Sequence, residues 1–121
     1  MTENEWQNKV FTRLVRNELK YDDFFIYSVP NGGIRDKVTA RIMQWTGLRK
    51  GVSDLHIIGG GKIIMLELKK GSKGVQSVEQ KVFESKIKSN GFKYILSYPN
   101  SNDIDKCLDE LEKEVMSYLY G

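Results

Sequence analysis

Three charged residues near the middle of the chain have the types and spacing that bind a divalent cation. Glu67 and Lys69 are two residues apart in a β-rich segment, so both side chains point to the same face of a strand. Asp54 begins the preceding β-rich segment, and antiparallel pairing would bring its carboxylate close to that of Glu67. Two adjacent carboxylates repel each other unless a cation lies between them. The pattern therefore predicts a metal site that contains Asp54 and Glu67.

The chemistry expected of such a site is phosphodiester hydrolysis. Carboxylate oxygens suit Mg²⁺ or Mn²⁺, and either ion can bind a phosphate and activate a water molecule. Lys69 could position that water or stabilise the negative charge that develops in the transition state. An alternative stays open, because an acid at a strand start and a Glu-x-Lys on a strand are commonly only solvated charges or a cross-strand ion pair.

The segments around these residues show helical or strand periodicity. Amphipathic helices are predicted where apolar residues recur every three or four positions, in residues 3–20, 35–48, 77–90 and 104–119. Strands are predicted in the β-branched and aromatic segments 24–29, 54–58, 62–69 and 93–98. Gly59, Gly60 and Gly61 join the middle two strands and can supply the positive φ angles of a tight hairpin. The predicted order is αβαββαβα.

The length and composition of the chain limit its domain organisation, its partners and its location. The 121 residues are expected to form a single domain, residues 1–121. Nineteen Lys and Arg against sixteen Asp and Glu give a net charge of +3, which permits an anionic partner without identifying one. The one cysteine, Cys107, cannot form an intramolecular disulfide, and no apolar run reaches the roughly 18 residues of a membrane span. We therefore expect a cytoplasmic protein with no membrane partner.

The motifs resemble those of the VRR-NUC family in the PD-(D/E)xK nuclease superfamily. In chain order they are Pro30-Asn31-Gly32-Gly33, Gly51-Val52-Ser53-Asp54, Glu67-Leu68-Lys69, and Ser77-Val78-Glu79-Gln80 followed by Phe83 and Gly91. The similarity extends from about residue 3 to residue 98. It implies an α/β fold with a restriction-endonuclease-like core, in which helices flank a mixed central sheet. Ser53 departs from the pattern, since the family usually has proline there, and this should loosen the turn slightly.

The resemblance also implies an Mg²⁺- or Mn²⁺-dependent endodeoxyribonuclease with no organic cofactor. Asp54, Glu67 and the backbone carbonyl of Leu68 would bind the metal, and Lys69 would assist catalysis. The family carries a further acidic residue on its first helix. A helical wheel favours Glu3, which shares the face of the apolar residues, over Glu5, which points to the opposite side. A favourable charge near a helix N-terminus explains Glu3 equally well.

Two further polar residues have both functional and structural interpretations. Gln80 resembles the active-site glutamine of the family and could orient the attacking water. Ser77 and Gln80 also have the spacing of a capping box, which satisfies the first amides of a helix. His56 lies two residues after Asp54 on the same strand face, but a lone histidine there more often packs, so we leave it outside the site.

Candidate DNA contacts lie in a glycine turn and among scattered basic residues. Asn31, Gly32 and Gly33 could place backbone amides against a phosphate, although an ordinary turn uses the same residues. The basic candidates are Arg35, Arg49, Lys50, Lys70 and Lys73. Most scattered charges of this kind are only solvated. Trp45, spaced helically with Ile42, fits a core or dimer contact better than a base-stacking platform.

Short stand-alone members of the family resemble junction-resolving enzymes. A four-way junction has two symmetric scissile strands, which a twofold dimer can match. We therefore expect a homodimer that cleaves branched DNA such as Holliday junctions, in a bacterial or phage-infected cell. Two alternatives stay open. One is a nucleic-acid-binding module without catalysis, and the other is a phage or restriction-type endonuclease that acts on linear duplex DNA.

Overall fold

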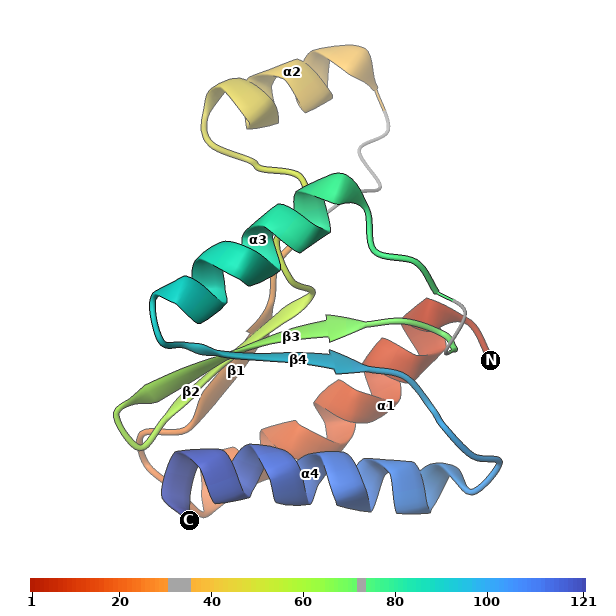
Figure 1. The fold of residues 1–121 in the computed structure, drawn as a ribbon, viewed down its shortest axis with the longest axis vertical. Helices are drawn as coiled ribbons and strands as arrows, with labels where there is room; N and C mark the ends of the chain where they lie inside the picture. The colour runs from red at the N-terminus through yellow and green to blue at the C-terminus, as the bar shows by residue number, and fades with distance from the viewer. Residues whose placement is uncertain (31–35, 72–73) are drawn as a thin grey trace.

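The molecule is organised around one β-sheet with helices on both faces (Figure 1). The computed structural model describes residues 1–30, 36–71 and 74–121. Helices α1 (Glu3–Val15) and α4 (Ile104–Tyr120) cover one face of the sheet, and α3 (Val78–Ser89) covers the other. Helix α2 (Lys37–Trp45) lies away from the sheet, beyond α3. A short 3₁₀ helix, η1 (Arg16–Leu19), continues from α1.

The sheet is mixed, as the motifs implied. Within the described residues it has four strands in the order β1 (Phe25–Ser28), β2 (Leu55–Gly59), β3 (Lys62–Leu68) and β4 (Lys93–Ser97). Strands β1, β2 and β3 pair antiparallel, whereas β3 and β4 are parallel and joined through α3. The element order αβαββαβα is confirmed, with η1 as an addition.

The tight turn between β2 and β3 decides which side chains face each side of the sheet. Gly59 pairs with Lys62, and the two residues between them, Gly60 and Gly61, have φ angles of 59° and 74°. Positive φ at both central positions belongs to a type I′ turn, whose twist matches that of the strands. With the register fixed, the even-numbered residues of β3 face α1 and α4, so Glu67 and Lys69 face α3.

The hydrophobic core lies between the sheet and the pair α1 and α4. It consists of Trp6, Val10, Leu14, Phe24, Ile26, Leu55, Ile57, Ile64, Leu66, Leu68, Ile95, Cys107, Leu108, Leu111, Val115 and Leu119. Each fully buried aliphatic side chain of this kind contributes about 1.5–3 kcal/mol of transfer free energy. The core therefore supports β2 and β3 on the face opposite to the candidate site.

Four helices begin at side chains that accept hydrogen bonds from the first turn. The caps are Thr2, Asp36, Ser77 and Asp103, and each accepts from the amide three residues later. Such caps each contribute about 1 kcal/mol and fix where a helix starts. For α1 and α3 this matters most, because their first turns carry Glu3 and Gln80.

Two parts of the predicted apolar pattern are wrong. Helical spacing predicts Leu19 on the buried face of the first helix, but it is 92% exposed because α1 gives way to η1 after Val15. In α3, helical spacing predicts Val78, Val82 and Phe83 on one apolar face, but Val78 and Val82 are exposed while Phe83 is partly buried. At 100° per residue the two valines lie on a different side of the helix from Phe83. No helix in the described ranges has the length and apolarity to cross a membrane.

Candidate active site

Glu67 is a fully buried carboxylate on the third strand of the sheet. Its Oε1 accepts a hydrogen bond from the Tyr94 hydroxyl. Its Oε2 is buried, has no hydrogen-bond partner among the described residues, and lies 3.8 Å from Lys69 Nζ. A buried carboxylate normally has its oxygens fully satisfied, since an uncompensated buried charge is strongly destabilising. Glu67 Oε2 is therefore available to bind a positively charged partner.

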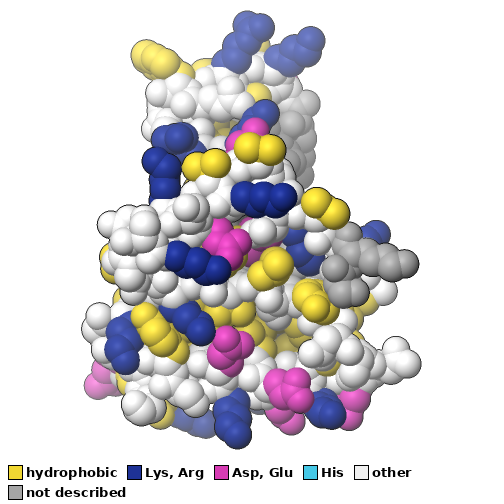
Figure 2. Space-filling model, in the orientation of Figure 1, with side chains coloured by type: hydrophobic (Ala, Val, Ile, Leu, Met, Phe, Trp, Pro, Cys, Tyr) yellow, Lys and Arg dark blue, Asp and Glu magenta, His cyan; other side chains and the backbone are white. Residues whose placement is uncertain are grey.

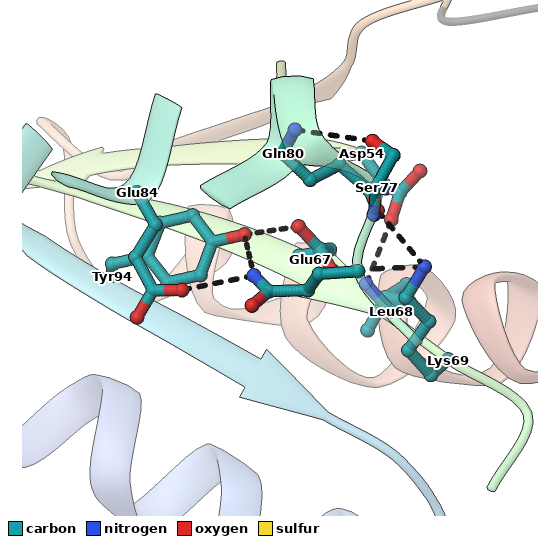
Figure 3. A network of polar contacts seen from close by, with 9 residues as sticks. Asp54, Glu67, Leu68, Lys69, Ser77, Gln80, Glu84 and Tyr94 are labelled. Atoms are coloured by element: carbon teal, nitrogen blue, oxygen red, sulfur yellow. Dashed lines mark hydrogen bonds and ion pairs between the residues drawn. The ribbon is translucent and has the colours of Figure 1, made fainter. Parts of the chain in front are cut away.

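Asp54 stands immediately before β2 and directly across from Glu67. Leu55 pairs with Leu66, and the Asp54 carbonyl accepts from the Val29 amide at 2.9 Å, which continues the pairing between β1 and β2. The Asp54 side chain turns toward β3, where its Oδ2 accepts from the Leu68 amide at 2.7 Å. The register thus places Asp54 opposite Glu67, and a hydrogen bond from the Leu68 amide orients the Asp54 carboxylate (Figure 3).

Lys69 and Gln80 meet between the end of β3 and the start of α3 (Figure 3). Lys69 Nζ donates to Gln80 Oε1 at 3.2 Å, and the same oxygen accepts from the Ser77 amide at 2.8 Å. Ser77 Oγ in turn accepts from the Gln80 amide at 3.1 Å, which completes a capping box. The capping-box interpretation of Gln80 is therefore confirmed, and the same side-chain oxygen also contacts Lys69.

Glu3 lies within electrostatic reach of the other charged groups. Partial burial raises the pKa of the Glu3 carboxyl above its usual range, and the nearby charge of Asp54 raises it further. Glu67 adds to this effect, while Lys69 and Lys70 act in the opposite direction. Glu5, by contrast, accepts from the Thr2 amide at 3.4 Å as part of the helix cap. The arrangement agrees with the helical wheel in placing Glu3 rather than Glu5 toward the site.

The donors in this cluster suit a hard divalent cation. Asp54, Glu67 and Glu3 offer carboxylate oxygens, and the Leu68 carbonyl offers a backbone oxygen, which is the donor type that Mg²⁺ and Mn²⁺ prefer. The buried Glu67 Oε2 without a hydrogen bond is the specific feature that fits a bound cation. Among the described residues, no three His, Cys, Asp or Glu side chains are grouped so that they could hold a metal ion, so Glu3, Asp54 and Glu67 do not form a three-carboxylate site in this structure.

Gly51 brings the motif that contains Asp54 against the first turn of α3. Its φ is 88°, and a Cβ at this position would overlap the main chain of Glu79. Only glycine combines a positive φ with so close an approach between two backbones. Ser53, where the family pattern has proline, is fully buried, and its hydroxyl makes no hydrogen bond within the described residues. The close packing of Gly51 on the Glu79 main chain therefore helps to position this turn.

The candidate DNA contacts are only partly described by the structure. Arg49 and Lys50 are exposed in the connection after α2, and Lys70 is exposed directly after Lys69. Asn31, Gly32, Gly33, Arg35 and Lys73 lie outside the described residues. Figure 2 shows several Lys and Arg side chains gathered over the end of the molecule formed by α2 and α3. Positive charge is thus available on the side of the sheet that carries the carboxylates.

His56 packs against Tyr27, whereas Trp45 is exposed. The Nδ1 of His56 lies 3.1 Å from the Tyr27 hydroxyl, and the two rings meet edge to face. Burial lowers the pKa of His56, so the ring is packed in its neutral form. Trp45 is 87% exposed, so the predicted core position is wrong. Helix α2 buries none of its residues.

Three residues in the surroundings of Glu67 escape prediction from the sequence. Tyr94 bonds to Glu67, and Gln76 Nε2 donates to the Tyr94 hydroxyl at 3.3 Å and to Glu84 Oε1 at 2.9 Å. Tyr94 alternates with the core residue Ile95, which could have placed it on the outer face of its strand. The parallel register that puts it next to Glu67 has no signal in the sequence.

Comparison with known proteins gives a likeness at the level of structure. No family model and no curated protein matches the sequence. A solved structure described as a VRR_NUC domain protein superposes with a TM-score of 0.67 and 19% identity, covering 95% of this chain and 88% of that one. Another, described as a VRR_NUC domain, gives a TM-score of 0.58 and 16% identity, covering 90% and 97%. The chain therefore has a VRR-NUC-like fold, as its motifs implied.

Proposed function

We propose that the protein is a DNA endonuclease that depends on Mg²⁺ or Mn²⁺. The observation that carries this proposal is the buried Glu67 carboxylate, which has one oxygen without a hydrogen bond among the described residues, 3.8 Å from Lys69 Nζ and on the strand that pairs with the one following Asp54. A solvated charge or a simple cross-strand ion pair does not require burial of the acid. The VRR-NUC-like fold supports the same conclusion, and Asp54 and Glu67 lie in the sequence motifs that resemble that family.

Each residue of the cluster has a distinct task in this proposal. Asp54, Glu67, Glu3 and the Leu68 carbonyl would hold the ion. When bound, the ion supplies a Lewis acid for the phosphate and lowers the pKa of a water molecule. Lys69, held by Gln80 at 3.2 Å, presents an ammonium group that can donate to that water or to a phosphate oxygen.

The DNA would approach from the side of α2 and α3. Arg49, Lys50 and Lys70 are exposed there and can contact phosphates, and each such contact adds to the salt sensitivity of binding. Asn31, Gly32, Gly33, Arg35 and Lys73 are proposed to extend this contact. Charges of this kind set position on the DNA backbone without reading sequence.

We further propose that the enzyme acts on branched DNA as a homodimer. The supporting observation is the exposed apolar stripe of α2, formed by Val38, Ile42 and Trp45 at helical spacing. Such a stripe is costly in water, and burial between two copies would remove that cost. Sedimentation of the wild type and of Trp45→Ser tests this. A dimer that the substitution dissociates supports the proposal, and a wild-type monomer at working concentration contradicts it.

The decisive experiment compares cleavage of a labelled four-way junction and a matched linear duplex. Each substrate is incubated with Mg²⁺, Mn²⁺ or a chelator, and Asp54→Ala is assayed beside the wild type. Junction cleavage that needs metal and is lost in the variant supports the proposal in full. Cleavage of the linear duplex moves the assignment to a general endonuclease. Tight binding that chelators do not affect, without cleavage, would favour a binding module.

A further inference from the structure

We propose that Tyr94 is a positioning residue that restricts Glu67 to a single metal-binding oxygen. This inference rests on the proposed metal-dependent function. The Tyr94 hydroxyl donates to Glu67 Oε1, while Oε2 has no hydrogen bond within the part of the chain that the structure describes. One oxygen is therefore held by the protein and the other is left for the ion. The consequence is a preference for ions that accept one oxygen per carboxylate.

The position of Tyr94 follows from the pairing of the two parallel strands. Tyr94 pairs with Met65, so its ring lies on the same face of the sheet as Glu67 and next to it. Both residues are buried, with Tyr94 at 8% exposure. A tyrosine hydroxyl in a buried site needs a partner, and here the partner is the carboxylate. The contact is thus shielded from water, which would otherwise compete for Glu67.

A second hydrogen bond fixes the direction in which the Tyr94 hydroxyl donates. Gln76 Nε2 donates to Glu84 Oε1 at 2.9 Å and to the Tyr94 oxygen at 3.3 Å. Both hydrogens of the amide are then used, and the Tyr94 oxygen acts as an acceptor. Its own hydrogen is left to point at Glu67 Oε1. Tyr94 therefore cannot turn its hydrogen elsewhere without losing the bond from Gln76.

Glu84 and Lys88 stabilise the outer end of this chain of contacts. Lys88 Nζ lies 2.5 Å from Glu84 Oε2. The hydrogen bond from Lys88 and then that from Gln76 lower the pKa of Glu84, which keeps it ionised as an acceptor. The amide of Gln76 must consequently present its nitrogen, not its oxygen, to Glu84. The orientation of the whole chain, from α3 to Glu67, follows from that charge (Figure 3).

Packing alone does not account for the hydroxyl of Tyr94. The ring lies 6.3 Å from that of Phe83 in an edge-to-face arrangement, which phenylalanine would provide equally well. Among the described residues, the hydroxyl adds only the contacts with Glu67 and Gln76. Mg²⁺ and Mn²⁺ favour octahedral coordination, whereas Ca²⁺ accepts both oxygens of one carboxylate in a more flexible shell. Fixing one oxygen therefore disfavours Ca²⁺.

The test measures dissociation constants of Mn²⁺ and Ca²⁺ by calorimetry for the wild type and Tyr94→Phe. We expect Mn²⁺ binding to weaken by about 10-fold or more, as for loss of other groups that orient metal ligands. Ca²⁺ binding should weaken less, since Glu67 can then offer both oxygens. The dissociation constant of Ca²⁺ divided by that of Mn²⁺ should therefore fall. A ratio that stays at the wild-type value, whether binding is unchanged or uniformly weaker, overturns the inference.

Two further variants separate this role from structural damage. Gln76→Leu leaves Tyr94 in place but removes the bond that directs its hydroxyl, so the ratio should shift the same way by a smaller factor. Tyr27→Phe removes a hydroxyl that bonds to His56 on the same sheet face, and it should leave the ratio unchanged. An equal shift in Tyr27→Phe contradicts the inference. A wild type that binds neither ion would instead refute the proposed function itself.

Discussion

Lys69 Nζ donates to Gln80 Oε1 across 3.2 Å, and this hydrogen bond connects the residue after β3 with the first turn of α3. The ammonium group is also 3.8 Å from Glu67 Oε2. Lys69 therefore has two partners. The neutral Gln80 side chain orients the ammonium group, and the charged Glu67 carboxylate would also bind the proposed metal ion. Its position depends on a strand and on a helix that reach the site from different parts of the chain.

Replacing Lys69 should slow cleavage severely while DNA binding persists. In Lys69→Ala the group that stabilises negative charge is lost, and removal of one such donor costs about 10²–10³-fold in kcat. Single-turnover cleavage with saturating Mn²⁺ measures this directly. Lys70→Ala is the matched control, since Lys70 is the exposed neighbour. It should keep kcat and reduce the salt slope of DNA binding by about 1. Wild-type rates in Lys69→Ala would remove Lys69 from the mechanism.

The two members of the capping box should separate stability from catalysis. Ser77→Ala removes the cap on the Gln80 amide and should lower the free energy of unfolding by about 1 kcal/mol. The Ser77 amide and its bond to Gln80 Oε1 remain, so cleavage should stay close to the wild-type rate. Gln80→Ala loses the contact with Lys69 and should lower kcat as well. Urea unfolding and cleavage assays on both variants test this, and equal kcat values would contradict it.

Gly51 and Gly91 should respond differently to alanine although both have positive φ. Gly91 has a φ of 80° with open space where a Cβ would lie, so Gly91→Ala should cost about 1–2 kcal/mol of backbone strain. In Gly51→Ala the added carbon also overlaps the Glu79 main chain. We expect a larger loss of stability there, with weaker Mn²⁺ binding because the turn before Asp54 must move. Thermal unfolding and calorimetry compare the two, and similar behaviour would show that the close packing is unimportant.

The hydrogen bond between Tyr120 and Asp23, at the end of the sheet far from the candidate site, should make the free energy of unfolding depend on pH. The bond from Tyr120, at 2.6 Å, and then that from the Gly60 amide lower the pKa of Asp23 below its usual 3.8. A lowered folded-state pKa means that this stabilisation is complete above pH 3.8 and is lost as the pH falls through the folded-state value.

Asp23→Asn tests that relationship. The variant should be less stable than the wild type at pH 7, and the difference should shrink as the pH is lowered below the unfolded-state pKa. Asp22→Asn changes the exposed neighbouring carboxyl and serves as the control. Chemical unfolding at several pH values provides the measurement. A difference that stays constant down to the acid limit would show that the Asp23 bonds do not contribute.

Much of this fold could be predicted from local signals in the sequence. The hairpin of β2 and β3 was recognisable because glycines at residues 59–61 separate two β-rich segments, and its register then placed Glu67 and Lys69 on one face. Glu3 was placed by helical periodicity alone. Local signals failed where tertiary packing determines the structure. Helical spacing placed Leu19 on the buried face of the first helix, whereas it lies in the 3₁₀ helix after α1.

The surroundings of Glu67 could not be predicted in the same way. Tyr94 reaches it through a parallel pairing between strands that are separated along the chain by α3. No turn fixes that register, and packing of α3 on the sheet determines it instead. Gln76 lies before the cap of α3, where neither helical nor strand periodicity applies. Such contacts require the folded molecule.

The candidate site joins parts of the chain that should open at different free energies. Glu67 belongs to a strand that is paired on both sides, whereas Glu3 and Gln80 come from the first turns of two helices. Helix ends fray well below the free energy of global unfolding, while central strands exchange their amide hydrogens last. Mild heating should therefore inactivate the protein reversibly before the sheet melts, and Mn²⁺ should protect the amides of these first turns from hydrogen exchange.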